Sequence, residues 1–198
     1  MTEFVKAVLR ESCDVKSAII NDDNLVALIN NVMEISIFSL RNGHKLLFAG
    51  NGGSASDAQH LAAELVGRYE QDREGLPALA LTTNSAQVTA IANDYGYDDV
   101  FKRQVQALAN KGDVFFGLST SGNSENVINA LQQCKSQGVV TVGFTGASGG
   151  NMQALCDYCI KIPSNITARI QESHITIGHI ICAGIEKVLF NNNAILKK

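Results

Sequence analysis

The chain has 198 residues, of which 45% are hydrophobic and 18% charged, and its formal net charge at pH 7 is −3. This composition is ordinary for a globular protein, and the length suffices for one sizeable core. Without an excess of positive charge, nucleic acid is not expected as a direct partner, and the longest apolar run, around residues 175–185, is too short to span a membrane.

Residues 2–42 are predicted to form two helices. In the second, apolar residues recur at helical spacing, Asp22 and Asp23 are candidate N-caps, and Gly43 ends the helix. Two long helices before the first strand have more apolar positions than one sheet face can cover, so we expect part of them to pack against another subunit. We assign residues 1–43 to oligomerisation, as part of the same domain as residues 44–198.

From Lys45 onward, predicted strands alternate with predicted helices. The strands are residues 46–49, 78–82, 114–118, 139–144 and 158–162. The helices are one that carries His60 and Glu64, followed by residues 86–92, 100–108, 125–136 and 167–190. Near-continuous apolar strands separated by helices indicate an α/β fold, with a five-stranded parallel sheet sandwiched by helices. Such sheets bind ligands at the carboxyl ends of their strands.

Two turns at predicted strand ends are candidate anion sites. GNGGSAS (50–56) precedes a helix, whose first backbone N–H groups have no helical partner. STSGNS (119–124) places four hydroxyls around Gly122, on Ser119, Thr120, Ser121 and Ser124. The alternative is that these serines only cap the next helix. Because one cap needs one hydroxyl, we favour a phosphate site.

Gly50, Gly52 and Ala55 also match the loose dinucleotide-binding pattern G-x-G-x-x-G/A. That fold needs an acidic residue at the end of the second strand, where this chain has Thr82-Thr83-Asn84. A dinucleotide is therefore disfavoured, and the lack of a P-loop lysine disfavours a nucleoside triphosphate.

Histidine and carboxylate candidates occur on two helices. His60 and Glu64, four residues apart, face the same side of their helix. His179 lies in an apolar run, where an unpartnered imidazole would be costly. These three residues, with Gln171 as a fourth ligand, would suit one Zn²⁺ per subunit. Gln171 and His179 are separated by a rise of ~12 Å on a straight helix, so sharing an ion requires an irregular first turn or a neighbouring subunit. His174 is more simply a core or surface histidine.

The five cysteines are Cys13, Cys134, Cys156, Cys159 and Cys182, an odd number that does not suggest a disulfide framework. With no apolar signal-peptide core near the first residue, a cytoplasmic location is expected. Cys156 and Cys159 form a C-x-x-C pair, but its first sulfur does not start a helix, so we predict two buried structural thiols.

Four segments resemble a known family: GNGGSASDAQHLAAELVGR, AIANDYGYDDVF, STSGNSENV and ARIQESHITIGHI. In this order, and over nearly the whole chain, they resemble the sugar isomerase (SIS) family and its branch acting on sedoheptulose 7-phosphate. The resemblance implies a flavodoxin-like sheet, a homotetramer and active sites built between subunits. It implies conversion of sedoheptulose 7-phosphate into D-glycero-D-manno-heptose 7-phosphate, the first step toward the activated heptoses of lipopolysaccharide, capsule or S-layer glycans.

The resemblance also implies roles for individual residues. The family's substrate contacts fall on Asn51, Gly52, Gly53, Glu64, Asn93, Asp94, Ser119, Thr120, Ser121, Ser124 and Gln171. Its zinc positions fall on His60, Glu64, Gln171 and His179. Ala168 stands where family members often have an acidic residue, so that acid's role is not assigned here.

Ketose–aldose interconversion moves a proton between C1 and C2 through an enediol, and a second proton between the two oxygens. We assign Glu64 as the base at carbon and His179 as the acid/base at oxygen. The serine turn is expected to hold the phosphate, and Asp94 to orient hydroxyls.

Two other functions share this fold. The DnaA initiator-associating protein is a non-catalytic SIS protein that resembles this chain in AIAND and ARIQE, but it tends to lack the counterparts of Glu64 and His179. Since both are present here, an enzyme is favoured. A hexose-phosphate isomerase or sensor is the other alternative.

Overall fold

Five short apolar strands form one parallel sheet in the computed structural model, which describes residues 1–190. The strands are β1 (Leu46–Gly50), β2 (Ala78–Ala80), β3 (Val114–Leu118), β4 (Val140–Thr145) and β5 (Tyr158–Lys161). Their order is β2-β1-β3-β4-β5, and all four pairings are parallel. This is the flavodoxin-like order, so the expected fold class is confirmed.

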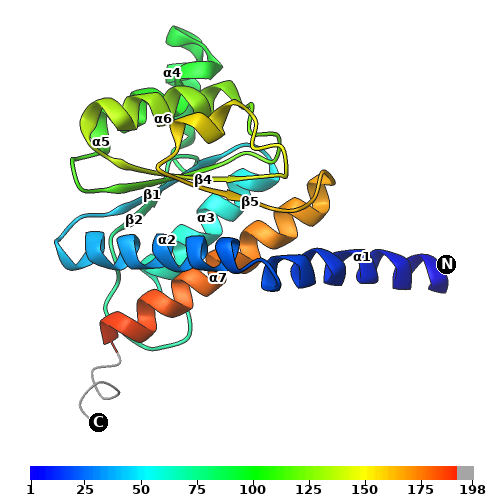
Figure 1. Cartoon of the computed structure of the whole chain (residues 1–198). Coiled ribbons are helices and arrows are strands. Elements are labelled where there is room, and N and C mark those ends of the chain that lie inside the picture. The colour runs from blue at the N-terminus through cyan, green and yellow to red at the C-terminus, as the bar shows by residue number, and fades with distance from the viewer. Residues whose placement is uncertain (191–198) are drawn as a thin grey trace.

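Helices cover both faces of the sheet (Figure 1). They are α1 (Thr2–Ile20), α2 (Asp23–Arg41), α3 (Gly53–Val66), α4 (Ser85–Tyr95), α5 (Val100–Leu108), α6 (Glu125–Gln137) and α7 (Thr167–Phe190), with short 3-10 helices η1 (Tyr97–Asp99) and η2 (Asn151–Leu155). Figure 1 shows α4, α5 and α6 on one side of the sheet and α2, α3 and α7 on the other. None of the helices described in residues 1–190 is both long and apolar enough to cross a membrane.

Two elements differ from their predicted lengths by more than one residue. β2 ends at Ala80 rather than at residue 82, because the N–H and hydroxyl of Thr83 both bond to the Ala80 carbonyl and turn the chain. α4 is longer than predicted, because the Asn84 side chain caps its start and the helix continues to Gly96, whose φ is 90°.

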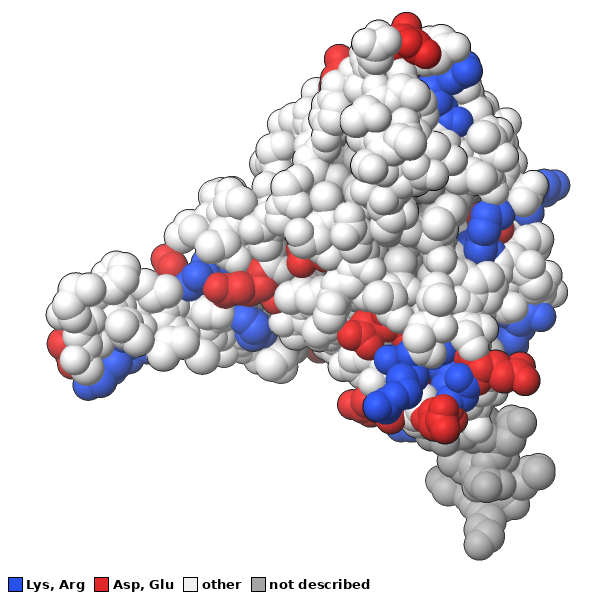
Figure 2. Space-filling model, turned by 180° about the vertical axis from the view of Figure 1, so that it is seen from behind, with Lys and Arg blue, Asp and Glu red and all other residues white. Residues whose placement is uncertain are grey.

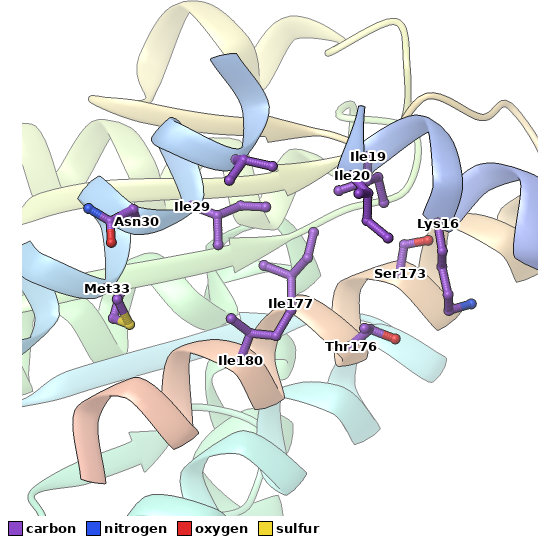
Figure 3. A pocket seen from close by; sticks show the side chains of 11 residues that line it. Lys16, Ile19, Ile20, Ile29, Asn30, Met33, Ser173, Thr176, Ile177 and Ile180 are labelled. Carbon is purple, nitrogen blue, oxygen red and sulfur yellow. The ribbon is translucent and has the colours of Figure 1, made fainter. Parts of the chain in front are cut away.

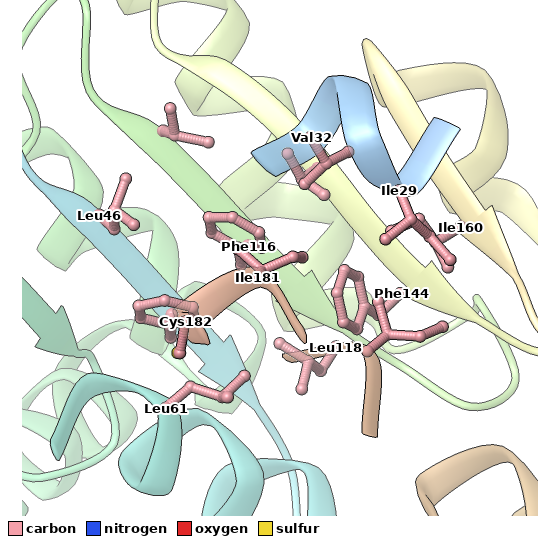
Figure 4. Close-up of a cluster of buried hydrophobic side chains, with 14 of the residues drawn as sticks. Ile29, Val32, Leu46, Leu61, Phe116, Leu118, Phe144, Ile160, Ile181 and Cys182 are labelled. Carbon is pink, nitrogen blue, oxygen red and sulfur yellow. The ribbon is translucent and has the colours of Figure 1, made fainter. Parts of the chain in front are cut away.

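Apolar side chains on the two faces of the sheet form two separate cores. On one face, the stacked rings of Phe48 and Phe116 lie 4.8 Å apart, and Phe144 packs edge-on against Phe116 at 6.0 Å. Side chains from α2, α3 and α7 cover these rings (Figure 4). On the other face, Leu47 and Phe115 pack beneath α5 and α6. Burial on both faces explains why the strands are apolar at successive positions.

The helix α1 extends away from the body of the molecule (Figures 1 and 2). Ile19 is its one buried residue, whereas Phe4 and Leu9 are more than half exposed. On the face shown in Figure 2, acidic and basic side chains are interspersed. The leading helices therefore present the uncovered apolar surface that the sequence predicts.

An apolar groove of about 380 Å³ lies between α1, α2 and α7 (Figure 3). It is lined by Lys16, Ile19, Ile20, Val26, Ile29, Asn30, Met33, Ser173, Thr176, Ile177 and Ile180. Hydrocarbon dominates these walls, so the groove suits apolar side chains rather than a phosphorylated sugar.

The two candidate N-caps of α2 can be separated by mutation. Asp22 accepts hydrogen bonds from the backbone N–H of Asn24 (3.1 Å) and Leu25 (3.0 Å), whereas Asp23 is the first helical residue. We expect Asp22→Ala to lower the free energy of unfolding by about 1 kcal/mol, and the matched control Asp23→Ala to lower it by only a few tenths. Urea denaturation measures both, and equal losses would contradict the assignment of Asp22.

Candidate active site

Three ionisable side chains converge between α3 and α7. His60 and Glu64 lie one turn apart on α3, with 3.2 Å between His60 Nε2 and Glu64 Oε1. From α7, His179 places its Nε2 2.9 Å from His60 Nε2. The two helices approach closely at Gly178, where a Cβ would lie 2.5 Å from a methyl carbon of Leu61. Because Gly178 has no side chain, the helices come close enough for His60 and His179, 119 positions apart in the sequence, to be in contact.

The donor atoms of His60, Glu64 and His179 fit a divalent metal ion. All three lie within 4.8 Å of one another. Two imidazoles and one carboxylate are a donor set that Zn²⁺ takes in catalytic sites, where the ligand atoms of a tetrahedral ion are ~3.3 Å apart. The side chain of His60 is 49% exposed, so the cluster is also open to a substrate.

Gln171, the fourth predicted metal position, lies apart from this cluster along α7. This helix runs without interruption from Thr167 to Phe190, so the irregular first turn that would bring Gln171 to His179 does not occur. The Gln171 amide instead packs against Gly53, where a Cβ would lie 2.5 Å from its Nε2. Gly53 starts α3, ~10 Å along that helix from His60. One chain thus brings three of the four predicted metal positions together.

Two neighbours of the cluster were not singled out from the sequence. Asp57 lies one turn before His60, and its Oδ2 is buried with no hydrogen-bond partner in residues 1–190. Burial raises the pKa of Asp57, and the charge of His60 partly offsets this. The ring of Tyr69 lies 5.5 Å from that of His179. Asp57 could have been predicted to face the site, because it lies three residues before His60 on the same helix. Tyr69 lies in a loop, so no helical spacing places it there.

The hydroxyls of the serine turn gather on one another. Ser119 Oγ lies 2.8 Å from Ser124 Oγ and 3.5 Å from Ser121 Oγ. Ser124 is the N-cap of α6, yet its hydroxyl makes no capping hydrogen bond within the described chain. The simple capping interpretation therefore does not account for Ser124, and the clustered hydroxyls lie at the start of a 13-residue helix, where an anion is favoured.

A third turn, which follows β4, packs against the serine turn. Gly122 has φ 68°, and a Cβ there would lie 2.2 Å from the carbonyl oxygen of Gly149, so another side chain would not fit. The backbone N–H of Met152 donates to the Gly122 carbonyl at 3.0 Å. The turn after β4 thus fixes the shape of the turn after β3.

Asn51 links the first turn to the serine turn. Its carboxamide and that of Asn126 on α6 bond reciprocally, at 2.8 and 2.9 Å, and the hydroxyl of Tyr97 donates to Asn51 Oδ1 at 3.0 Å. Because β1 and β3 are neighbours in the sheet, their carboxyl ends place these turns side by side. Asn126 and Tyr97 were missed from the sequence, since their role appears only once the turns are adjacent.

Asn93 and Asp94 lie away from the His60 cluster. They occupy the last turn of α4, where Asn93 Nδ2 donates to Asp94 Oδ1 at 2.8 Å, and both are exposed. Figure 1 shows α4 on the opposite side of the sheet from α7. One chain therefore does not bring these two predicted substrate contacts to His179.

His174 is a core residue, in keeping with the simpler interpretation of the sequence. It is fully buried beside Phe144, and its Nε2 lies 3.3 Å from the carbonyl oxygen of Thr145. Burial lowers its pKa to about 4, and the hydrogen bond to Thr145 offsets this only in part. His174 is therefore neutral near pH 7.

Cys156 and Cys159 are half-buried, not buried as predicted. The interaction between the two thiols raises the pKa of Cys156 and lowers that of Cys159. Cys156 follows the short helix η2 and Cys159 lies in β5, so neither starts a helix.

Comparison with known proteins gives consistent matches. Residues 14–146 match the family model described as the SIS domain. A phosphoheptose isomerase of Aneurinibacillus thermoaerophilus is 54% identical over 198 residues, which is 100% of each chain. The structure of a phosphoheptose isomerase from Neisseria gonorrhoeae superposes with a TM-score of 0.88 at 42% identity, covering 94% of this chain and 98% of that one. One from Francisella tularensis gives 0.90 at 34% identity, with the same coverage.

The buried neutral state of His174 predicts a dependence of stability on pH. Its pKa is about 4 in the folded protein against 6.5 as the ordinary value, so below pH 6.5 the unfolded chain binds a proton that the folded chain does not. The ionisation of His174 therefore leaves the free energy of unfolding unchanged above pH 6.5. As the pH falls from 6.5 to 4, it lowers the free energy of unfolding by about 3 kcal/mol. His174→Gln should flatten the curve by that amount in denaturant titrations, and parallel curves for the two proteins would contradict the assignment.

Proposed function

The chain belongs to the SIS domain family, and from this membership and its 54% identity to a phosphoheptose isomerase we propose that it isomerises sedoheptulose 7-phosphate to D-glycero-D-manno-heptose 7-phosphate. It is an aldose–ketose isomerase. The observation that carries the reaction is the convergence of His60, Glu64 and His179 on the facing sides of α3 and α7. A carboxylate and an imidazole within reach of one sugar are the groups that proton transfer through an enediol requires.

The two proton transfers are divided between two side chains. Glu64 removes a proton from C1 of the ketose, which gives the enediol, and returns a proton to C2 of the aldose. His179 moves the second proton from the C1 oxygen to the C2 oxygen. Atoms balance, because the product is an isomer of the substrate. The contact of Glu64 Oε1 with His60 Nε2, at 3.2 Å, holds the carboxylate at this cluster.

We propose that His60, Glu64 and His179 hold one Zn²⁺ per subunit. Such an ion would polarise the carbonyl and stabilise the enediolate as a Lewis acid. In that arrangement Glu64 would be both a ligand of the ion and the base of the reaction. Gln171 would serve as a metal ligand only from a neighbouring subunit, and within its own chain its place beside Gly53 suits a contact with the sugar.

The remaining proposed contacts hold the substrate away from its reacting carbons. The hydroxyls of the serine turn, Ser119, Thr120, Ser121 and Ser124, bind the phosphate, with help from the N-terminus of α6. The first turn, Asn51, Gly52 and Gly53, lies beside it at the carboxyl edge of the sheet. Asn93 and Asp94, on the other side of the sheet, orient hydroxyls at a site shared with another subunit.

A homotetramer fits the uncovered surface of the leading helices. Phe4 and Leu9 on α1, Phe38 on α2 and Ile180 on α7 are each at least half exposed, and the apolar groove lies among these helices. Packing these surfaces together would place residues of one subunit near the open cluster of the next. We propose that the protein acts in the cytoplasm, where its product would be used to make activated heptoses for surface glycans.

The non-catalytic alternative is less well supported. A DnaA-associating protein would not need Glu64 or His179, which the fold brings to a common point. A panel of ketose phosphates tests the alternative of a hexose-phosphate substrate. We expect the highest kcat/KM with sedoheptulose 7-phosphate. A higher kcat/KM with a hexose phosphate would contradict the proposed substrate.

Glu64→Gln and His179→Gln should each lower kcat by about 10²-fold or more, because each removes a proton-transfer group. Formation of the aldose phosphate from sedoheptulose 7-phosphate measures turnover, and circular dichroism checks folding. His44→Gln is the matched control, since His44 lies at the other edge of the sheet, beside Asp113. Near wild-type turnover in either site variant would remove that residue from the mechanism.

Zinc dependence follows from the donor set. The purified protein should contain about one Zn²⁺ per subunit, and treatment with a chelator should lower activity, which added Zn²⁺ restores. His60→Gln should lose metal while keeping its secondary structure. Full activity in protein shown by elemental analysis to be metal-free would refute the zinc proposal without touching the roles of Glu64 and His179.

Phosphate binding by the serine turn predicts an effect on KM. Ser124→Ala removes one hydroxyl donor and should raise KM about tenfold, equivalent to ~1.4 kcal/mol, with a smaller change in kcat. Ser136→Ala, an exposed serine at the other end of α6, is the control. If both variants keep the wild-type KM, Ser124 does not contact the substrate.

A further inference from the structure

A buried carboxylate on α7 holds the loop that follows α3. Glu186 is 1% exposed, and its two oxygens accept backbone N–H groups from three consecutive residues: Tyr69 at 2.8 Å, Glu70 at 2.9 Å and Gln71 at 3.1 Å. Arg73 adds a fourth bond, from Nε at 2.9 Å. Burial alone would raise the pKa of Glu186, but these bonds outweigh it and hold the pKa below its usual range.

Arg73 extends the same network to the end of α3. Its Nη2 donates to the carbonyl oxygen of Glu64 at 2.8 Å, and its Nη1 donates to that of Leu65 at 2.6 Å. These carbonyls belong to the last turn of α3, where a helix lacks internal partners. The guanidinium therefore caps the turn that carries Glu64, while its Nε is fixed by Glu186.

The network meets the proposed active site at two places. Through Arg73 it fixes the backbone of Glu64, and through the Tyr69 N–H it fixes a residue whose ring lies 5.5 Å from that of His179. Glu186 and His179 lie two turns apart on the same helix. One carboxylate thus connects α7, the end of α3 and the loop that follows α3.

We propose that Glu186 and Arg73 are positioning residues for the isomerase reaction, which set the relative placement of Glu64 and His179. This inference rests on the proposed function. A displacement of about 1 Å between reacting groups can cost 10²-fold in rate, so a clamp on both helices affects turnover more than substrate binding. Glu186 and Arg73 themselves do not touch the proposed substrate.

The test compares Glu186→Gln with a buried carboxylate of similar chemistry elsewhere. Asp113 is also 1% exposed and accepts from two backbone N–H groups, of Lys45 and Asn110, and from Lys45 Nζ. It lies before β3, at the opposite edge of the sheet from the turns. Asp113→Asn therefore reproduces the loss of a buried acceptor without reaching α3 or α7.

We expect Glu186→Gln to lower kcat for sedoheptulose 7-phosphate tenfold or more, with KM within about threefold. The NH2 group of the new amide would face backbone N–H groups or the Arg73 guanidinium, which are also donors. Arg73→Lys should act in the same direction, since an ammonium cannot span the same carbonyls. Asp113→Asn should keep kcat within twofold at a comparable loss of Tm. In NMR spectra, the imidazole signals of His60 and His179 should shift in Glu186→Gln and not in Asp113→Asn.

Two outcomes would overturn the proposal. One is a folded Glu186→Gln with wild-type kcat and unshifted imidazole signals. The other is failure of both Glu186→Gln and Arg73→Lys to fold, which would make the pair a requirement of the fold rather than of the site. Lack of turnover by the wild-type protein would instead count against the proposed function, and the NMR comparison would still report on positioning.

Discussion

The close packing of α7 on α3 is the constraint on which the site depends. Gly178 removes the side chain that would hold the helices apart, and Leu61 occupies the space. With the helices this close, His60 and His179 reach contact at 2.9 Å although one precedes β2 and the other follows β5. Two neutral imidazoles in contact at their Nε2 atoms form one hydrogen bond, in which one ring donates and the other accepts.

Polar side chains at the two ends of the strands have different structural roles. At the carboxyl edge, the turns after β1, β3 and β4 support one another through Asn51, Asn126 and the glycine contact at residue 122. At the amino edge, Asp113 fixes the start of β1 through Lys45. The hydrogen bonds at the carboxyl edge hold the turns beside one another, whereas those at the amino edge fix the start of a strand.

Much of the architecture could be predicted from the sequence because its signals are local. Apolar runs bounded by glycine and serine gave the five strands, and helical spacing gave α2 and the shared face of His60 and Glu64. What local patterns do not contain is the approach of distant elements. Nothing in the sequence around Gly178 indicates that another helix packs against it. Glu186, Arg73 and Tyr69 are residue types typical of a surface, and their contacts appear only once α7 packs against the loop after α3. Gln171 shows the reverse: the sequence predicts it as a fourth metal ligand, whereas the unbroken helix α7 keeps it from His179 within one chain.

The make-up of the serine turn has a consequence for how the protein would respond to ionic strength. Residues 119–124 contain no lysine or arginine, so a phosphate held there would be bound by short-range dipoles rather than by net charge. Such contacts are little weakened by dissolved ions, which screen interactions over a Debye length of about 8 Å at physiological concentrations. Retention of the substrate would then be nearly independent of salt, and the product, with the same anionic end, would leave without having to break an ion pair.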